Sequence, residues 1–201
     1  MSSDPRDRAP AGPSRPEADD GGWRRRASRY LFESPWYKLR QDELTLPGGQ
    51  EITYTLVEHP GYAMVVPCRE DGRVLMERVY RHTLQQVTLE CPSGGMDGEP
   101  PESAARRELE EETGYLADHW EHLGRFFGSS GISDEHYHLY LATGLRHEGR
   151  MARECTEQME LEWVPLEDLR RAVLGGELRD GPSALGVLLA WERLRTQGQL
   201  R

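Results

Sequence analysis

The sequence predicts a mixed α/β domain with a helix on each face of its sheet, preceded by a small antiparallel β element. Strand-like runs come before one strongly marked helix, further strands follow it, and helical patterns close the chain. At 201 residues the chain is long enough for one ordinary domain, or for one domain with a small appendage.

The N-terminal part is predicted to be a disordered tail followed by a β-hairpin. Residues 1–28 are rich in Pro, Gly and charge and lack the apolar stretch of a secretory signal. In residues 29–58, "WYKLRQDELTL" alternates loosely, "PGGQ" is typical of a turn, and "EITYTLVEH" is rich in β-branched and aromatic residues. These patterns predict an antiparallel hairpin.

Residues 59–198 are predicted to form the main domain. "GYAMVVPC", "VLMERVYR" and "QQVTLECP" predict three strands, the last ending at Pro92. After a loop and the marked helix, "WEHLGRFFGS", "EHYHLYLATGL" and "MELEWV" predict three more strands. Pro165 ends the last strand, and "LEDLRRAVLGG" is helical up to its glycine pair. A final helix is expected to begin at Ser183.

Composition narrows the partners and the compartment. A net charge of −10 argues against binding to a nucleic-acid backbone. Without a run of about eighteen apolar residues, no segment is expected to span a membrane. The three cysteines, Cys68, Cys91 and Cys155, show no CxxC spacing, which favours free thiols in a reducing cytoplasm.

The marked helix carries an unusual charge. Pro100 and Pro101 suit a first helical turn, and Gly114 suits a left-handed C-terminal position. Between them, the spacing i, i+3, i+4 places three carboxylates on one face, those of Glu108, Glu111 and Glu112. Like charges at this spacing destabilise a helix by about 0.2–0.5 kcal/mol per pair.

Two interpretations of these glutamates compete. They could form a solvated face, with Arg106 and Arg107 pairing with Glu110 and Glu111. Alternatively they could hold a divalent cation, because Mg²⁺ takes carboxylate oxygens together with water and substrate phosphate. The preceding loop favours the second interpretation, since its glycines let the backbone approach a ligand closely; they are Gly94, Gly95 and Gly98.

Residues 99–115, "EPPESAARRELEEETGY", resemble the Nudix box, G-x5-E-x7-R-E-U-x-E-E-x-G-U, in which U is apolar. The spacing from Glu99 to Arg107 fits, as does every position from Arg107 to Gly114. Tyr115 stands where an aliphatic residue is usual. Ser93 stands where the box opens with glycine and Gly94 follows it, so the loop is one residue short.

This resemblance implies a Nudix-type α/β/α sandwich with a mixed sheet. It also implies a hydrolase that splits a diphosphate linked to another moiety, with Mg²⁺ or Mn²⁺ as cofactor. Glu108, Glu111 and Glu112 would be the metal carboxylates, and Arg107 would orient them through an ion pair with a glutamate of the box.

Further segments resemble the ADP-ribose pyrophosphatase group. "LECPSG" resembles its "E-L-P-A-G" run, which implies that Glu90 and Gly94 contact substrate and that the Ser93 carbonyl ligates a metal. "ERVYRHT" resembles its "V-x-Q-Y-R" strand, so Arg81 would contact the diphosphate; otherwise it is a surface arginine at a strand end.

"GSSGISDEHYHLYLA" resembles that group's "P-S-P-G-x-S-x-E" loop, with Gly131 and Glu135 in register, which makes Glu135 a candidate substrate contact. Ser130 stands where a proline marks ADP-ribose specificity. Some group members carry a late glutamate that acts as general base or metal ligand. Glu157 is the candidate here, followed by Glu160 and Glu154; the alternative is a solvated face.

The resemblance therefore implies hydrolysis of ADP-ribose to AMP and ribose 5-phosphate by a homodimer whose N-terminal β element exchanges segments. The alternatives are the same chemistry on a dinucleoside polyphosphate, NADH, coenzyme A or a damaged nucleotide, or a nucleotide-sugar sensor without turnover. His136 and His138 have a zinc-like spacing on a strand, but the sequence offers no evident third ligand.

Overall fold

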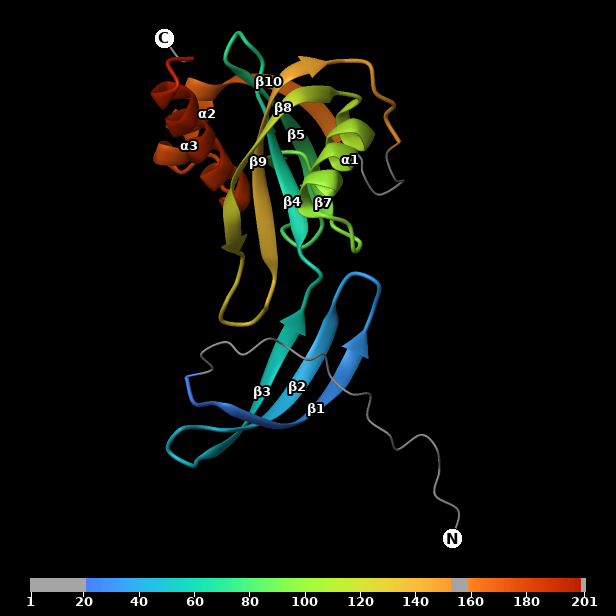
Figure 1. Ribbon diagram of the computed structural model, residues 1–201, viewed down its shortest axis with the longest axis vertical. Coiled ribbons are helices and arrows are strands. Elements are labelled where there is room, and N and C mark those ends of the chain that lie inside the picture. Colours follow the sequence, from blue (N-terminus) through green and yellow to red (C-terminus); the bar gives the residue numbers. More distant parts are fainter. Residues whose placement is uncertain (1–20, 153–158, 200–201) are drawn as a thin grey trace. The chain divides into compact units, whose positions relative to one another are not determined.

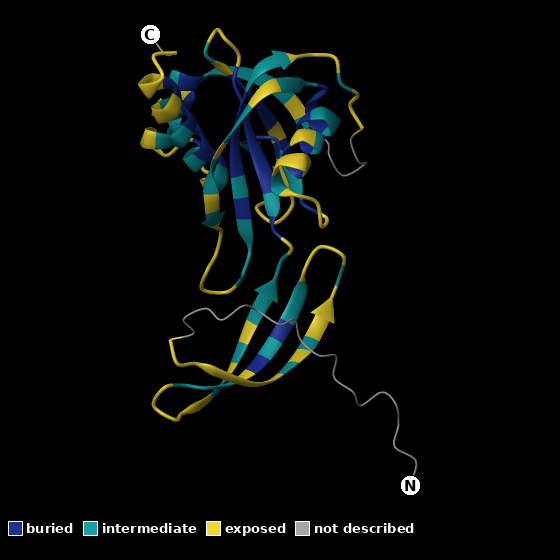
Figure 2. Cartoon of the chain, in the orientation of Figure 1, coloured by how far each residue is buried: buried dark blue, intermediate teal, exposed yellow. Residues whose placement is uncertain are grey.

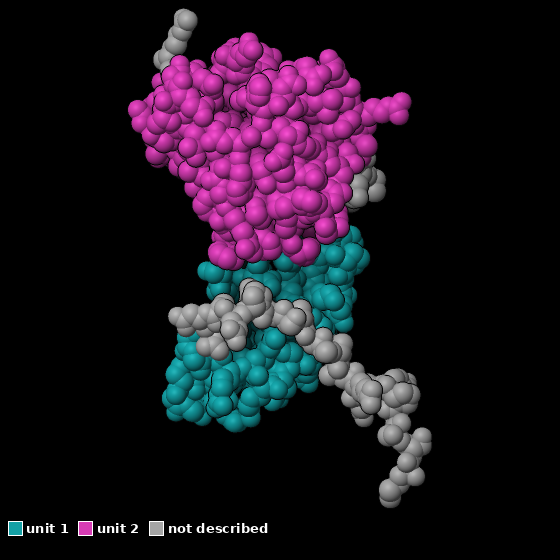
Figure 3. All heavy atoms as spheres, in the orientation of Figure 1, with its two compact units in different colours: residues 1–59, 129–135 teal, residues 60–128, 136–201 magenta. Residues whose placement is uncertain are grey.

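The computed structural model describes residues 21–152 and 159–199. The chain divides into two compact units, coloured separately in Figure 3. Unit 1 takes in the described residues up to His59 together with Ser129–Glu135, and unit 2 comprises Pro60–Gly128 and the described residues from His136 onward.

Unit 1 is a three-stranded antiparallel sheet in the order β1-β2-β3, formed by β1 (Arg24–Glu33), β2 (Lys38–Thr45) and β3 (Glu51–Glu58). The predicted hairpin corresponds to β2 and β3. The prediction that a disordered tail extends to residue 28 differs from the structure, because β1 starts at Arg24 and pairs there with Thr45. The sequence at the start of β1, residues 24–26, shows no alternation of polar and apolar residues, yet an edge strand needs only backbone hydrogen bonds to one neighbour.

The segment Ser129–Glu135 belongs to unit 1 because it lies against β3. The Val57 amide donates to the Ile132 carbonyl at 2.8 Å, and the Tyr54 hydroxyl donates to the Gly131 carbonyl at 2.8 Å. Val57 also forms a parallel bridge with Ser133. This loop, singled out by sequence as a substrate loop, is therefore anchored on the N-terminal sheet.

Unit 2 contains two sheets (Figure 1), in the orders β7-β4-β9-β8 and β10-β5-β6. The first sheet is mixed, since β4 runs parallel to β9 while its other pairs are antiparallel. The strands are β4 (Tyr62–Pro67), β5 (Arg73–Arg81), β6 (Gln86–Glu90), β7 (Ser93–Gly95), β8 (Leu116–Phe127), β9 (His136–Arg146) and β10 (Met159–Pro165). The helices are α1 (Pro101–Thr113), α2 (Leu166–Gly175) and α3 (Gly181–Thr196).

The alternation of β4 separates two hydrophobic cores. Met64 and Val66 point into a core shared with α2 and α3, while Ala63 and Val65 point into a core shared with α1. Buried residues therefore concentrate on the central strands (Figure 2), with helices on both faces. This arrangement confirms the predicted α/β/α fold class.

The ends of the helices follow the local signals, with one exception. α1 ends at Gly114, whose φ is 73°, and α2 ends at Gly176, whose φ is 76°. Ser183 does not start α3, because the Asp180 side chain is the N-cap and accepts the Ser183 amide at 2.9 Å. Ser183 is buried, and its hydroxyl accepts the Cys91 amide at 2.9 Å. In the described ranges no helix is both long and apolar enough to cross a bilayer.

Candidate active site

The first component of the site is helix α1, which buries charge along with its apolar face. Leu109 is fully buried against the sheet together with its neighbours Ala104 and Ala105. Glu108 and Glu112 flank this apolar stripe and are only 7% and 5% exposed. Burying a carboxylate is costly unless it is paired or ligates a metal. For these two residues, the interpretation as a solvated face is therefore wrong.

The loop before α1 is shaped around the Glu108 carboxylate. A side-chain carbon placed on Gly94 would lie 2.2 Å from both Cδ and Oε1 of Glu108, far inside van der Waals contact. Sequence analysis predicted a loop here, but Ser93–Gly95 form the short strand β7, paired with Tyr62–Met64. Glycine is thus required because the backbone of β7 passes directly over the carboxylate.

A backbone amide of β7 holds the second buried carboxylate. The Ser93 N–H donates to Oε2 of Glu112 at 2.9 Å. A charge-assisted bond of this kind offsets part of the cost of desolvation. Ser93 and Glu112, both predicted to bind metal, therefore lie side by side.

Arg107 connects the loop to the helix. One end of its guanidinium donates to Oε1 of Glu108 at 2.7 Å and to Oε2 of Glu111 at 3.0 Å. The other end donates to the Gly95 carbonyl at 2.8 Å. Partial burial opposes the charge on Arg107, yet Glu108 and Glu111 together raise the pKa of Arg107 above its ordinary value. The ion pair that the resemblance implied between Arg107 and a glutamate of the box is therefore present, to both Glu108 and Glu111.

The other arginine of the helix has a different partner from the one expected. Arg106 pairs with Glu102 at 2.7 Å, one turn earlier, rather than with Glu110. Among the described residues, no group of three His, Cys, Asp or Glu side chains is arranged as a complete metal site. The carboxylates are gathered on one helix face, while Arg107 and Ser93 hold them.

A second cluster of charged side chains lies on β5 and β6. Arg81 forms a two-pronged pair with Glu90, with nitrogen–oxygen distances of 3.0 and 2.6 Å. Burial favours a raised pKa for Glu90, but hydrogen bonds from Arg81 and Thr88 outweigh it and hold the pKa of Glu90 below its ordinary value. The hydrogen bond to Glu90 raises the pKa of Arg81 despite partial burial, and the negative charges of Glu90, Asp180 and Glu112 add to this effect. Arg81 therefore interacts electrostatically with Glu112 of α1 as well as with Glu90.

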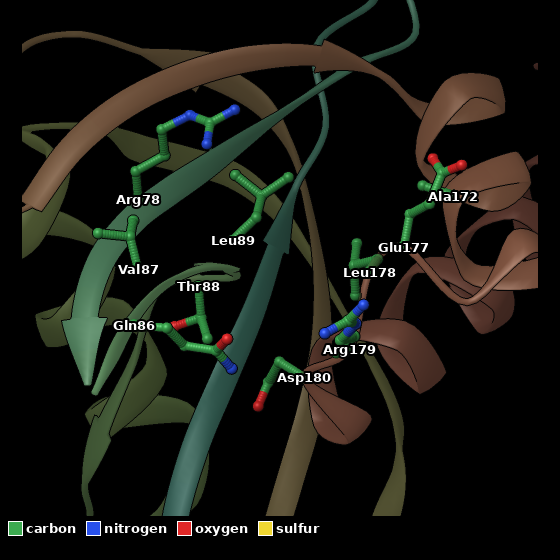
Figure 4. Close-up of a pocket in the computed structure, with 10 residues that line it drawn as sticks. All are labelled: Arg78, Gln86, Val87, Thr88, Leu89, Ala172, Glu177, Leu178, Arg179 and Asp180. Carbon is green, nitrogen blue, oxygen red and sulfur yellow. The ribbon is translucent and has the colours of Figure 1, made fainter. Parts of the chain in front are cut away.

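A cavity of about 390 Å³ lies between β6 and the segment that joins α2 to α3 (Figure 4). Its walls come from Arg78 on β5, from residues 86–89 of β6, from Ala172, and from residues 177–180 between α2 and α3. Thr88 lines the cavity and hydrogen-bonds to Glu90. The lining includes neither Arg81 and Glu90 nor any of the α1 glutamates, so Thr88 is the lining residue that connects the cavity to the Arg81–Glu90 pair.

The remaining predicted residues belong to unit 1, to strand β10 or to a segment outside the described residues. Glu135 belongs to unit 1, where its carboxylate lies 3.9 Å from His59 Nε2. Glu160 is exposed on β10 opposite Arg78. Glu154 and Glu157 fall outside the residues that the structure describes.

Two residues beside Arg81 were missed by sequence reasoning. Thr88 lies two positions before Glu90 on the same strand, so the period of a strand could have indicated it. Asp180 opens a helix just before a glycine and a proline, which is an N-cap pattern. Its proximity to Arg81 depends on tertiary packing and leaves no local signal.

Comparisons with known proteins agree with this architecture. The NUDIX domain model matches residues 58–183, and the model for the nucleoside diphosphate sugar hydrolase N-terminal domain matches residues 23–57. The chain is 38% identical over 165 residues to an ADP-ribose pyrophosphatase of Mycobacterium tuberculosis, covering 81% of this chain and 80% of the relative. It is 32% identical over 163 residues to an ADP-ribose pyrophosphatase of Bacillus subtilis, covering 80% and 88%. A crystal structure of an ADP compounds hydrolase superposes with a TM-score of 0.77 at 21% identity, covering 89% of this chain and 97% of that one.

Proposed function

The chain belongs to the NUDIX domain family and is a pyrophosphohydrolase, and from that premise we propose that it hydrolyses ADP-ribose to AMP and ribose 5-phosphate. Two relatives that share about four fifths of its length are ADP-ribose pyrophosphatases. The observation that carries the proposal is the pair of buried carboxylates on α1, for which Gly94 leaves room.

The α1 cluster has the chemistry of a site for a hard divalent cation. Its donors are all oxygens, two of its carboxylates are buried, and glycine stands where any side chain would displace Glu108. The groups that would hold Mg²⁺ or Mn²⁺ are the Ser93 carbonyl and the side chains of Glu108, Glu111 and Glu112. When bound there, the cation would screen the diphosphate and activate water.

The protein's own groups would bind and orient the substrate. Arg81 is anchored by Glu90 and still half exposed, so it can donate to a diphosphate oxygen without losing its anchor. Arg107 keeps Glu108 and Glu111 in position through charged hydrogen bonds. Gly94 has no side chain, so it leaves room for the Glu108 carboxylate beside β7. Glu157 is proposed as the general base, and Glu135 as a further substrate contact.

The test is product analysis with ADP-ribose and Mg²⁺ in oxygen-18 water. The proposal predicts AMP and ribose 5-phosphate, with the heavy oxygen on one product, which identifies the phosphorus attacked. EDTA should abolish the reaction because it removes the cation. Turnover that EDTA leaves unchanged would contradict the metal role. Failure to cleave any nucleoside diphosphate would contradict the proposed function.

A second substrate class is supported by one residue. Ser130 stands where the resemblance expects the proline of ADP-ribose specificity. Parallel assays with a dinucleoside polyphosphate, NADH and coenzyme A decide between the two. If kcat/KM for one of these compounds exceeds that for ADP-ribose, that compound is the better candidate substrate, and the proposed diphosphate hydrolysis is unchanged.

We also propose a homodimer in the cytoplasm. Unit 1 carries exposed apolar side chains suited to a partner surface, namely Trp23, Leu31, Phe32, Trp36 and Tyr37. Cys68 and Cys91 are free, and burial raises the pKa of Cys68 to about 11, as expected of inert thiols in a reducing compartment. Light scattering should give twice the mass of one chain, and a single-chain mass would remove the dimer.

A further inference from the structure

Three histidines lie close together on strands β8 and β9 of the sheet that α1 covers. His136 and His138 alternate along β9, and His122 comes from the neighbouring strand β8. Nε2 of His122 lies 3.1 Å from Nδ1 of His138. The ring centroids of His136 and His138 are 6.0 Å apart. The sequence showed no further ligand beside His136 and His138, and the structure places His122 of the adjacent strand next to His138.

From this geometry we propose that His122 and His138 form a binding site for a first-row transition-metal ion such as Zn²⁺, Cu²⁺ or Ni²⁺. Imidazole nitrogen suits these ions, whereas Mg²⁺ prefers oxygen. The site is thus chemically separate from the carboxylates of α1.

The separation of the two nitrogens fits a shared ion. Zinc–nitrogen bonds of about 2.0–2.1 Å that meet at roughly 90–109° place the nitrogens about 2.9–3.4 Å apart. The observed 3.1 Å lies inside this range. Without an ion, one ring donates N–H to the other. For both nitrogens to ligate, that proton moves to the other nitrogen of its own ring, and small rotations turn the two lone pairs toward the ion.

The strands hold the two rings in place. β8 has a bulge between His122 and Gly124, where φ of Gly124 is 145°. A bulge re-aims a side chain, and here it shifts the register beside His138. The His122 ring also packs on Tyr140, with centroids 4.9 Å apart, and Tyr140 belongs to the buried core under α1. The pair is therefore supported by packed structure on one side and open to solvent at His122.

The protonation state suits a ligand. Partial burial, assisted by the nearby His122, His136 and Arg125, lowers the pKa of His138 below its ordinary value. Neutral imidazole is the form that binds metals. In the part of the chain that the structure describes, no third His, Cys, Asp or Glu completes a three-ligand set. Water or another exchangeable ligand would fill the other positions.

The test is calorimetric titration of the full chain, free of any polyhistidine tag, with ZnCl₂ in excess Mg²⁺. We expect one Zn²⁺ per chain for the wild type and loss of that binding in His122→Ala and His138→Ala. His119→Ala is the matched control, because His119 lies on the same strand but lines a cavity beside Leu194 of α3. It should bind Zn²⁺ like the wild type.

A second variant separates coordination from folding. In His138→Asn the amide can keep the hydrogen bond to His122 but is a poor metal ligand, so the fold should persist while binding is lost. Thermal unfolding followed by circular dichroism checks the fold. With Cu²⁺, electron paramagnetic resonance should show hyperfine coupling to two nitrogens in the wild type. Absence of Zn²⁺ binding, or wild-type binding in His138→Asn, would overturn the proposal.

Discussion

The two faces of the main sheet in unit 2 are packed in different ways. The core under α2 and α3 is built from large aliphatic side chains, including Leu139, Leu141, Leu166 and Leu169. The core under α1 is smaller and rich in alanine, with Leu109 and Tyr140 among its larger buried members. Both faces rest on the same strands, β4 and β9 (Figure 1).

This difference indicates a division of labour. The α1 face buries fewer large apolar side chains and also buries two carboxylates. Each buried carboxylate by itself lowers the stability of the fold. The aliphatic side chains buried under α2 and α3 stabilise the fold and offset this cost. Changes on the α1 face should therefore act mainly on activity, and changes on the other face mainly on stability.

The largest effect is expected for Glu112→Gln. Turnover should fall by a factor on the order of 10²–10³ because Glu112 is one of the carboxylates proposed to bind the metal. The free energy of unfolding should stay the same or rise, because the amide oxygen can still accept from Ser93 while a buried charge is removed. Steady-state kinetics and urea unfolding on the same preparation measure both. A variant with wild-type turnover would remove Glu112 from the mechanism.

Leu169→Ala should show the reverse pattern. Leu169 is 1% exposed in the larger core, so truncation should cost about 2–5 kcal/mol of unfolding free energy. kcat/KM per folded molecule should stay within a few-fold of the wild type. The matched control is Leu174→Ala on the same helix, which is 66% exposed and should change stability by less than about 0.5 kcal/mol. Equal losses in the two variants would refute the assignment of stability to this face.

Gly94→Ala tests the link between the loop and the carboxylates. The added methyl would meet Glu108 at 2.2 Å. Displacing that carboxylate by about 1 Å should lower kcat/KM about 100-fold, and overpacking should cost about 1–3 kcal/mol of stability. Gly181→Ala is the control, because nothing lies within 4 Å of its added carbon and its φ is not positive. If Gly94→Ala were as active as Gly181→Ala, the steric argument would be wrong.

Arg81→Gln should give the smallest of the predicted losses of stability, with a characteristic pH dependence. The folded pKa of Glu90 lies below its ordinary value of 4.5, so the pair stabilises the fold above that pH and the stabilisation fades as Glu90 takes up a proton. The variant should lose about 1 kcal/mol at pH 7, since Arg81 is half exposed and screened.

This deficit should shrink as the pH falls below 4.5. Arg78→Gln, on the same strand but paired with the exposed Glu162, serves as the control and should show almost no change at either pH. Urea unfolding at pH 7 and at acidic pH provides the comparison. A deficit in Arg81→Gln that is independent of pH would exclude Glu90 as its cause.

The sequence predicted the elements that have strong local signals. Prolines and Gly114 mark both ends of α1, and the alternation in β9 marks its two faces. Strand β1 was missed because its pairing is a backbone property that its sequence, RRRASRYLFE, does not reveal. Ser183 resembled a helix start, but Asp180 three residues earlier caps the helix.

The site was only partly predictable for the same reason. The i, i+3, i+4 spacing identified the glutamates of α1, but whether a charged helix face is buried depends on what passes over it. Here β7 covers Glu108 and Glu112, and the sequence of the helix alone does not predict that contact. Likewise, His122 and His138 meet across two strands at a bulge, and local periodicity does not specify the register.

We propose that α1 tolerates crowded negative charge because a divalent ion would neutralise it when bound. The most direct test counts Mn²⁺ bound to the wild type and to folded Glu112→Gln by electron paramagnetic resonance. The wild type should bind Mn²⁺, and the variant should bind it far more weakly at the same protein concentration. Equal Mn²⁺ binding by both proteins would contradict the assignment of the metal to these carboxylates.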